Sequence, residues 1–162
     1  MAETPTTTTT TPRPLPQGYT LTPGFPALQE YLHLRSASGL TPKTPAQGTA
    51  VLGGSWYGVY ISHTDPTTRT QTAVAMGRII SDGGWYFHIA DMAVLPEHQR
   101  KGLGDVVLKA LLEYIRVNAP EGEPYVNLLA DPPGRRLYQR NGFVDSAPGS
   151  VGMVYSVRRG QQ

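Results

Sequence analysis

The chain has 162 residues, the usual size of one domain, and a formal net charge of only +2. Nucleic-acid binding requires clustered lysine and arginine residues, and this sequence has no such cluster. The sequence holds no cysteine, which excludes a disulfide scaffold, a thiolate metal site and a cysteine nucleophile. No apolar run approaches the roughly 20 residues of a membrane span, and no signal or transit peptide is recognisable. We therefore expect a cytoplasmic protein without nucleic-acid or membrane partners.

The first residues differ in composition from the rest of the chain. Residues 4–16 hold seven threonines and four prolines. Such a segment has almost no apolar surface to bury, so we expect a disordered tail over residues 1–16. The remaining residues, 17–162, are then expected to form a single domain.

In the first half of that domain, the sequence predicts one strand, then one or two helices, then further strands. Residues 18–22 alternate as a short strand, and residues 26–38 have helical spacing. Residues 41–55 are ambiguous, because a proline could open a short helix that several glycines would weaken. Three strands in a meander follow, with a glycine hairpin turn at residues 81–84, and they cover residues 56–61, 72–80 and 85–94.

The second half opens with the strongest helix signal of the chain. Apolar residues recur at helical spacing from Leu103 to Ile115, and the pattern stops before Pro120. A buried strand is expected next, then a short helix with Asp131 as its N-cap and Gly142 closing it in the left-handed conformation. The strands predicted after Ile115 cover residues 125–130, 143–144 and 151–157.

The segment from Val94 to Gly104 carries the clearest chemical signal. A strand ends there, and a long helix begins inside the run Gln-x-x-Gly-x-Gly at residues 99–104. Free backbone N–H groups at the positive end of a helix dipole bind anions, and glycines let phosphates approach closely. Arg100 and Lys101 add positive charge. The spacing matches neither a nucleoside-triphosphatase P-loop nor a dinucleotide fingerprint, and an ordinary strand–helix connection is the alternative interpretation.

This loop resembles the acetyl-coenzyme A (acetyl-CoA) loop of the GCN5-related N-acetyltransferase (GNAT) superfamily, Gln/Arg-x-x-Gly-x-Gly/Ala. Leu-Tyr-Gln-Arg-Asn-Gly-Phe at residues 137–143 resembles a second motif of that family, and the two stand in the expected order with a strand between them. The resemblance implies an α/β (α+β) GNAT fold, in which helices flank a mixed central sheet of about six to seven strands. It also implies a splay between the fourth and fifth strands.

The resemblance implies where the cosubstrate acetyl-CoA binds. Backbone N–H groups of residues 99–104 would hold the pyrophosphate, the strand before the loop would pair with the pantetheine arm, and Arg140 could reach the 3′-phosphate. Asp131 stands where many members of the family have an asparagine, whose side-chain amide donates a hydrogen bond to pantetheine. A carboxylate cannot donate that hydrogen bond, so a structural role is favoured for Asp131. The full expected set is Met92, Ala93, Val94, Gln99, Arg100, Lys101, Gly102, Leu103, Gly104, Asp105, Asp131 and Arg140.

Three side chains are candidates for catalysis. Tyr138 matches the family tyrosine that protonates the departing thiolate, although core packing is its alternative role. His88 lies on the strand where the family places its general base, and a free imidazole titrates near neutral pH. Asp91 points to the opposite face by strand parity unless a bulge intervenes, as the family predicts. It could also attract a cationic acceptor or brace the loop.

The expected acceptor wall is aromatic and polar, formed by Tyr31, Arg35, Phe87, Tyr125 and Tyr155. Few carboxylates face it, which favours a small amine such as an amino sugar, an arylalkylamine or a diamine. Acetylation of a protein lysine or N-terminus, or a non-catalytic acyl-CoA sensor, remain alternatives. Because cysteine is absent, we expect direct transfer in a ternary complex. We expect no metal, since the histidines lack ligand spacing, and either a monomer or a homodimer.

Overall fold

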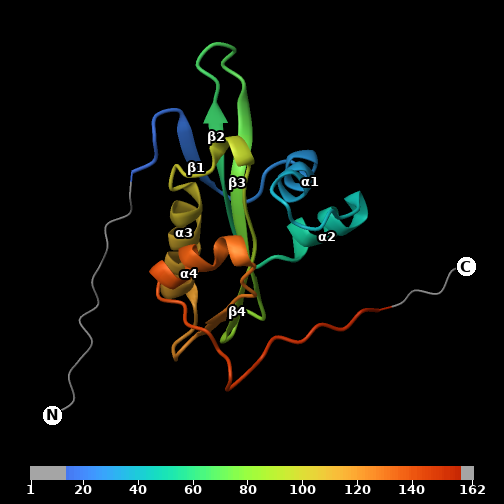
Figure 1. Ribbon diagram of the computed structural model, residues 1–162, viewed down its shortest axis with the longest axis vertical. Helices are drawn as coiled ribbons and strands as arrows, with labels where there is room; N and C mark the ends of the chain where they lie inside the picture. The colour runs from blue at the N-terminus through green and yellow to red at the C-terminus, as the bar shows by residue number, and fades with distance from the viewer. Residues whose placement is uncertain (1–13, 158–162) are drawn as a thin grey trace, which may run out of the picture. The chain divides into compact units, whose positions relative to one another are not determined.

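The computed structural model describes residues 14–157, so most of the predicted tail lies outside the described residues. The chain divides into two compact units, one ending at Leu128 and the other beginning at Leu129. No helix within the described range is both long and apolar enough to cross a membrane. The first unit carries the sheet, and the second carries one short α-helix (Figure 1).

The first unit is built on a mixed sheet whose strands lie side by side in chain order. All neighbouring strands are antiparallel except the last pair, which is parallel. The predicted meander is confirmed, and Gly83 takes a φ of 76° in its second turn. The five strands are β1 (Tyr19–Pro23), β2 (Tyr57–Thr64), β3 (Gln71–Ser81), β4 (Tyr86–Val94) and β5 (Tyr125–Asn127).

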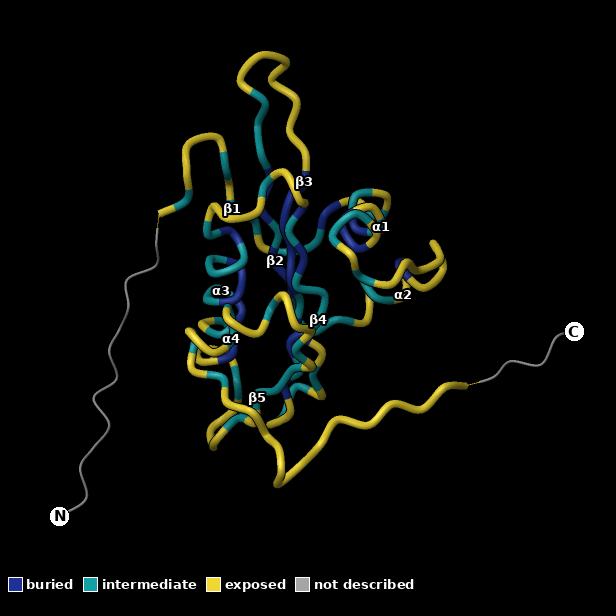
Figure 2. The backbone as a smooth tube through the Cα atoms, in the orientation of Figure 1, coloured by how far each residue is buried: buried dark blue, intermediate teal, exposed yellow. Residues whose placement is uncertain are grey.

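Helices cover both faces of this sheet (Figure 1). One face carries α1 (Leu28–Ala37) and α2 (Pro45–Gly54), and the other carries α3 (Leu103–Asn118). Figure 2 shows the buried residues concentrated along the central strands and the inner side of α3. The predicted amphipathic helix is thus confirmed, and each large apolar side chain that it buries contributes about 1.5–3 kcal/mol. Its buried stripe is Leu103, Val107, Leu108, Leu111 and Ile115.

The segment left ambiguous by its glycines is a helix, α2. Thr44 and Gln47 form a reciprocal capping box at its start, which offsets the poor helix propensity of the sequence. Gly48 has a packing role, because a Cβ there would lie 2.7 Å from Leu28 Cδ1 and 3.1 Å from Leu32 Cδ2. The glycine that weakens the helix signal is what lets α2 lie against α1.

The predicted number of strands is wrong, because the described chain has five instead of six to seven. Residues 143–144 and 151–157 form no strand, and β5 ends at Asn127, short of residue 130. Met153 and Tyr155 are 92% and 89% exposed. Alternating apolar residues become a strand only where another strand edge accepts their hydrogen bonds, and none does so here.

The second unit is short. It contains a 3-10 turn, η2 (Pro132–Gly134), followed by α4 (Arg135–Arg140). Gly142 closes α4 with a φ of 88°, as predicted. Asp131 occupies the N-cap position of η2, but its side chain makes no capping hydrogen bond, so that part of the prediction is wrong.

Side chains pack closely around Gly77 of β3. A Cβ at this position would lie 2.6 Å from Met92 Sδ, 2.8 Å from Val107 Cγ1 and 2.9 Å from Leu111 Cδ1. Only glycine therefore lets β3 approach α3 and the end of β4 so closely.

We expect Gly77→Ala to destabilise the protein by about 1–3 kcal/mol, because the new methyl group overpacks this contact. Thermal and urea unfolding measure the effect. Gly53→Ala is the matched control, since Gly53 lies in α2 with nothing within 4 Å of an added Cβ. The control should unfold like the wild type or slightly later. Equal unfolding of the two variants would contradict the close contact between β3 and α3.

Candidate active site

A β-bulge near the end of β4 organises the candidate site. Met76 pairs with Ala93 and Arg78 pairs with Ala90, so Asp91 and Met92 together lie opposite a single residue of β3. Asp91 takes a φ of 54°, in the left-handed region that aspartate tolerates better than most residues. The bulge that the family resemblance predicts is therefore present.

The bulge brings His88 and Asp91 to the same face of the sheet. Arg78 bonds to Asp91, which contacts α1, so its side chain points to the α1 face. Ile80 lies two residues further along β3 and shares that face, and His88 is its cross-strand partner. Without the extra residue in β4, strict alternation would direct Asp91 to the opposite face.

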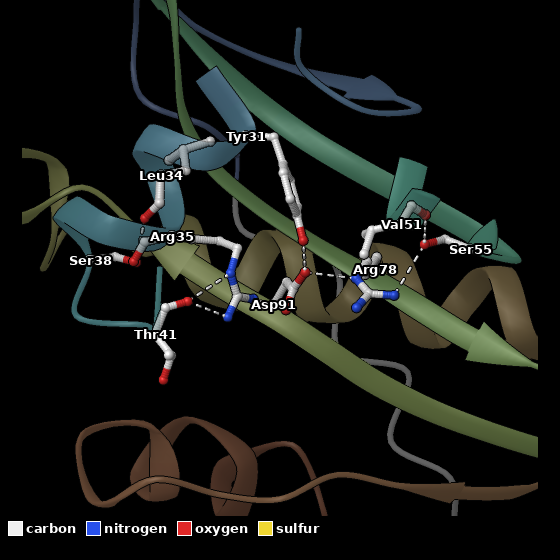
Figure 3. A network of polar contacts seen from close by, with 9 residues as sticks. All are labelled: Tyr31, Leu34, Arg35, Ser38, Thr41, Val51, Ser55, Arg78 and Asp91. Atoms are coloured by element: carbon white, nitrogen blue, oxygen red, sulfur yellow. Dashed lines mark hydrogen bonds and ion pairs between the residues drawn. The ribbon is translucent and has the colours of Figure 1, made fainter. Parts of the chain in front are cut away.

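Asp91 is the centre of a buried polar network (Figure 3). Tyr31, Arg35 and Arg78 all donate hydrogen bonds to its carboxylate, with Arg78 Nε 2.7 Å from Oδ2. Only 8% of the Asp91 side chain is exposed. The two arginines reach further, Arg35 to the Thr41 carbonyl and Arg78 to Ser55 Oγ. One carboxylate thus links β3 and β4 to α1 and to the residues that follow α1 and α2.

The network fixes the ionisation of its members. Burial by itself would raise the pKa of Asp91, but the hydrogen bonds from Tyr31 and Arg78 and the charges of both arginines outweigh it, and the pKa lies below its ordinary value. Burial and the hydrogen bond to Asp91 raise the pKa of Tyr31 to about 12. An ionised carboxylate with three donors is a poor proton acceptor, so this geometry favours bracing as the role of Asp91.

His88 has a different environment, on the side of β4 that faces β5. Its Nδ1 lies 2.6 Å from Oδ1 of Asn127, the residue paired with it in the parallel register. An amide oxygen only accepts hydrogen bonds, so Nδ1 carries a proton, and in the neutral imidazole the lone pair is on Nε2. Sequence reasoning missed Asn127. The available signal was one polar residue in the apolar run of residues 125–130, but its partner is set by strand register.

The pairing of β4 with β5 ends at His88 and Asn127. From Ile89 to Val94, β4 has no partner strand on its β5 side within the described chain. The expected splay therefore begins beside the His88 imidazole. This free edge, which includes Met92, Ala93 and Val94, can accept an extended ligand as an added strand.

The loop after β4 presents unpaired backbone donors. It turns through η1 (Pro96–His98) and positive φ angles at Arg100, 64°, and Gly102, 83°. Among the described residues, the backbone N–H groups from Arg100 to Gly104 have no hydrogen-bond acceptor. They lie at the N-terminus of the 16-residue helix α3, where the helix dipole favours an anion.

Side chains hold the loop in this shape. Gln99 Nε2 donates to the Val94 carbonyl at 3.0 Å, and Lys101 Nζ donates to the Glu97 carbonyl at 2.7 Å. Asp105 in the first turn of α3 forms an ion pair with Lys109 at 2.7 Å. Gln99, Lys101 and Asp105 thus have structural contacts, and the backbone is left to bind an anion.

The residues predicted to bind the acceptor are dispersed. Tyr31 and Phe87 are 1% and 0% exposed, and Arg35 is committed to the Asp91 network. Tyr125 is half exposed at the edge strand, with its ring 5.4 Å from that of Tyr86. Tyr155 is exposed in the second unit, outside any strand. Of this set, Tyr125 alone has an accessible side chain in the first unit.

Tyr138 lies on α4, in the second unit. Its ring packs on Gly134, where a Cβ would come within 2.8 Å, and lies 5.9 Å from the ring of Phe143. Burial, and secondarily the charge of Asp131, raise the pKa of Tyr138, so its hydroxyl stays protonated at neutral pH. Arg140, at the end of the same helix, is exposed. Across residues 14–157, no group of three or more histidine, aspartate or glutamate side chains could hold a metal ion.

Comparison with known proteins supplies independent evidence about the family of this chain. A family model described as an acetyltransferase (GNAT) domain matches residues 56–145. The chain is 32% identical over 102 residues to GCN5-related N-acetyltransferase 1, chloroplastic, of Arabidopsis thaliana, covering 60% of this chain and 50% of that protein. It is 31% identical over 99 residues to the uncharacterized N-acetyltransferase ycf52 of Porphyra purpurea, covering 60% of this chain and 53% of that one. The chain thus spans about half the length of the curated relatives it matches.

A solved structure extends the match to the fold. A probable acetyltransferase of unknown function from meticillin-resistant Staphylococcus aureus is 32% identical, with a TM-score of 0.75. The match covers 86% of this chain and 99% of that one. The mixed sheet and its flanking helices are therefore shared with a protein of similar length.

We expect Asp91→Asn to lower the free energy of unfolding at neutral pH by about 3–5 kcal/mol, because it leaves two buried guanidinium groups without a counter-charge. Asparagine tolerates the left-handed φ, so the loss reports on charge. Since the pKa of Asp91 is lowered by folding, its contribution is complete above about pH 4 and is lost as the pH falls below that.

Urea unfolding between pH 3 and pH 7 tests both expectations. The wild type should lose stability steeply at the acid end, and the variant should lose less. Glu113→Gln removes an exposed carboxylate that pairs with Arg116 and serves as control. It should unfold like the wild type. Equal stability of Asp91→Asn and Glu113→Gln would contradict a structural role for the buried network.

Proposed function

We propose that this chain, which belongs to the GNAT acetyltransferase family, transfers the acetyl group of acetyl-CoA to the primary amine of a small molecule. The proposal rests above all on the unpaired N–H groups from Arg100 to Gly104, which lie next to the open edge of β4. An anion binds the first feature, and an extended amide-bearing arm pairs with the second. Coenzyme A carries both groups.

The residues present fit this cosubstrate. The positive φ angles at Arg100 and Gly102 turn successive N–H groups outward, as a pyrophosphate requires. Gln99 and Lys101 stabilise the loop through Val94 and Glu97 carbonyls. When bound, acetyl-CoA supplies the acetyl group and leaves as the free thiol.

Two side chains carry out the proton transfers of the reaction. His88 Nε2 has a free lone pair and accepts the proton that the ammonium group of the acceptor must lose. The Tyr138 hydroxyl remains protonated and donates to the thiolate sulfur. One N–C bond forms as one C–S bond breaks, and the second proton that the nitrogen loses replaces the one donated by Tyr138. No acetyl-enzyme is needed. An acyl-CoA sensor would require neither group, so the poised His88 favours catalysis.

Charge and shape narrow the acceptor class. The Asp91 network contains two guanidinium groups and one carboxylate, so one positive charge is left over on the face that carries His88. This surplus disfavours an acceptor with a second positive charge and favours loss of the proton from a single ammonium. Beside His88 the sheet edge exposes Trp85, Tyr86 and Tyr125 in mutual ring contact. A monoamine with an apolar or ring-shaped body fits this surface better than a diamine does.

A thiol-release assay with a panel of amines tests this proposal. Arylalkylamines and amino sugars should release coenzyme A faster than diamines of similar length. Release only with peptides that carry a lysine or a free N-terminus would favour the protein-acetyltransferase alternative. Tight coenzyme binding with no release by any amine would favour the sensor.

We expect coenzyme A to raise the melting temperature of the wild type and to have no such effect on Gly104→Asp. The new carboxylate would repel the pyrophosphate and block the approach of the backbone. Aspartate is favourable in the first turn of a helix, so the variant should still fold. Gly53→Asp, in the exposed part of α2, is the control and should keep the full shift. A full shift in Gly104→Asp would exclude this loop as the pyrophosphate site.

We expect Tyr138→Phe to lower kcat by up to about 10²–10⁴-fold, the usual range for general acid catalysis, with an unchanged melting shift in coenzyme A. The substitution removes one hydroxyl and almost no packing volume. Steady-state kinetics with the best amine, at saturating acetyl-CoA, measure the effect. An enzyme with wild-type kcat under conditions where chemistry limits the rate would rule out this role.

A further inference from the structure

Asn127 contains a buried polar atom without a partner. Within the described residues, its Nδ2 is the single buried side-chain nitrogen or oxygen that makes no hydrogen bond. Native proteins rarely keep a buried donor unsatisfied, so such a group calls for an explanation, of which a catalytic role or a bound water or ion are examples. The other half of the same amide is fully engaged, since Oδ1 accepts from His88 Nδ1 at 2.6 Å.

The place of Asn127 in the sheet gives this donor a function. Asn127 and His88 form the last pair of the parallel β4–β5 register, so both stand where the two strands separate. With Oδ1 bonded to the imidazole, Nδ2 is left without a partner among the described residues. The unused N–H groups therefore lie at the start of the splay, one hydrogen bond away from the proposed base.

We propose that Asn127 has two linked roles: its Oδ1 fixes His88 as the Nδ1–H tautomer, and its Nδ2 donates a hydrogen bond to the carbonyl oxygen of the bound acetyl group. The inference rests on the proposed acetyltransferase function. The first role keeps the lone pair on Nε2, where the amine proton must go. The second places a donor on the oxygen that gains negative charge as the N–C bond forms.

Two substitutions separate these roles. Asn127→Asp has the same shape and still accepts from Nδ1, but it has no N–H group to donate. Asn127→Ala removes both the acceptor and the donor. Asn118→Asp is the matched control, because the Asn118 amide is exposed on α3 and donates to the Tyr114 carbonyl.

The first measurement is the ratio of the dissociation constants of coenzyme A and acetyl-CoA, obtained by calorimetry without an acceptor. One added hydrogen bond to the acetyl oxygen should make the wild type bind acetyl-CoA several-fold more tightly than coenzyme A. We expect this preference to disappear in Asn127→Asp and Asn127→Ala and to persist in Asn118→Asp. Retention of the wild-type preference in Asn127→Asp would overturn the donor role, whatever its activity.

The second measurement is the ¹⁵N NMR spectrum of the histidine rings in the free protein, with His88 assigned by comparison with His88→Gln. The wild type and Asn127→Asp should show His88 protonated at Nδ1, and Asn127→Ala should shift it toward the Nε2–H form preferred by free imidazole side chains. An Nε2–H tautomer in the wild type, or no change in Asn127→Ala, would overturn the positioning role.

These outcomes are distinct from a failure of the proposed function. If coenzyme A and acetyl-CoA both bind and amines are acetylated, but neither Asn127 variant changes the ratio or the tautomer, only this inference is wrong. If neither cosubstrate binds the wild type, the proposed function is wrong and the inference falls with it.

Discussion

The first unit of this protein depends on the hydrogen bonds and ion pairs that the buried carboxylate of Asp91 makes. It stands in a bulge, in a left-handed conformation, and receives hydrogen bonds from Tyr31, Arg35 and Arg78. Removing the charge would leave two buried guanidinium groups uncompensated, so the network is stable only when it is complete. Through it, the extra residue in β4 is linked to helix α1 and to Ser55, the residue that follows α2.

The bulge has consequences in both directions along β4. Before it, His88 lies on the same face as the network and pairs with Asn127, the last residue of β5. After it, β4 runs unpaired on its β5 side into the loop that opens α3. β4 and the loop after it therefore carry, in chain order, the His88 imidazole, an open strand edge and a set of free N–H groups. In the proposed function, this order matches the parts of acetyl-CoA, from the reacting carbonyl to the pyrophosphate.

Most charged side chains of the site are paired within the fold and are not available to bind a ligand. Lys101, Lys109 and Arg35 all have partners within the fold. In the proposed function the phosphates are therefore held by backbone N–H groups, which carry no net charge. Backbone donors in a fixed loop do not need to be reoriented when a phosphate arrives, which is the advantage of preorganisation. In the proposed function, the surplus positive charge of the Asp91 network is the electrostatic feature that an acceptor amine meets.

The sequence by itself determined the parts that depend on neighbours along the chain. The helix from Leu103, the glycine turn at Gly83, the left-handed closure at Gly142 and the turn that joins β4 to α3 all follow from local spacing and backbone sterics, and the structure shows each of them. Only the tertiary structure decided the strands after Gly142, because an alternating segment needs a partner edge that no local pattern specifies. The same reason hid Asn127, whose contact with His88 spans 39 positions and exists only through the parallel register. It also explains α2, where Gly48 weakens the local helix signal but packs against Leu28.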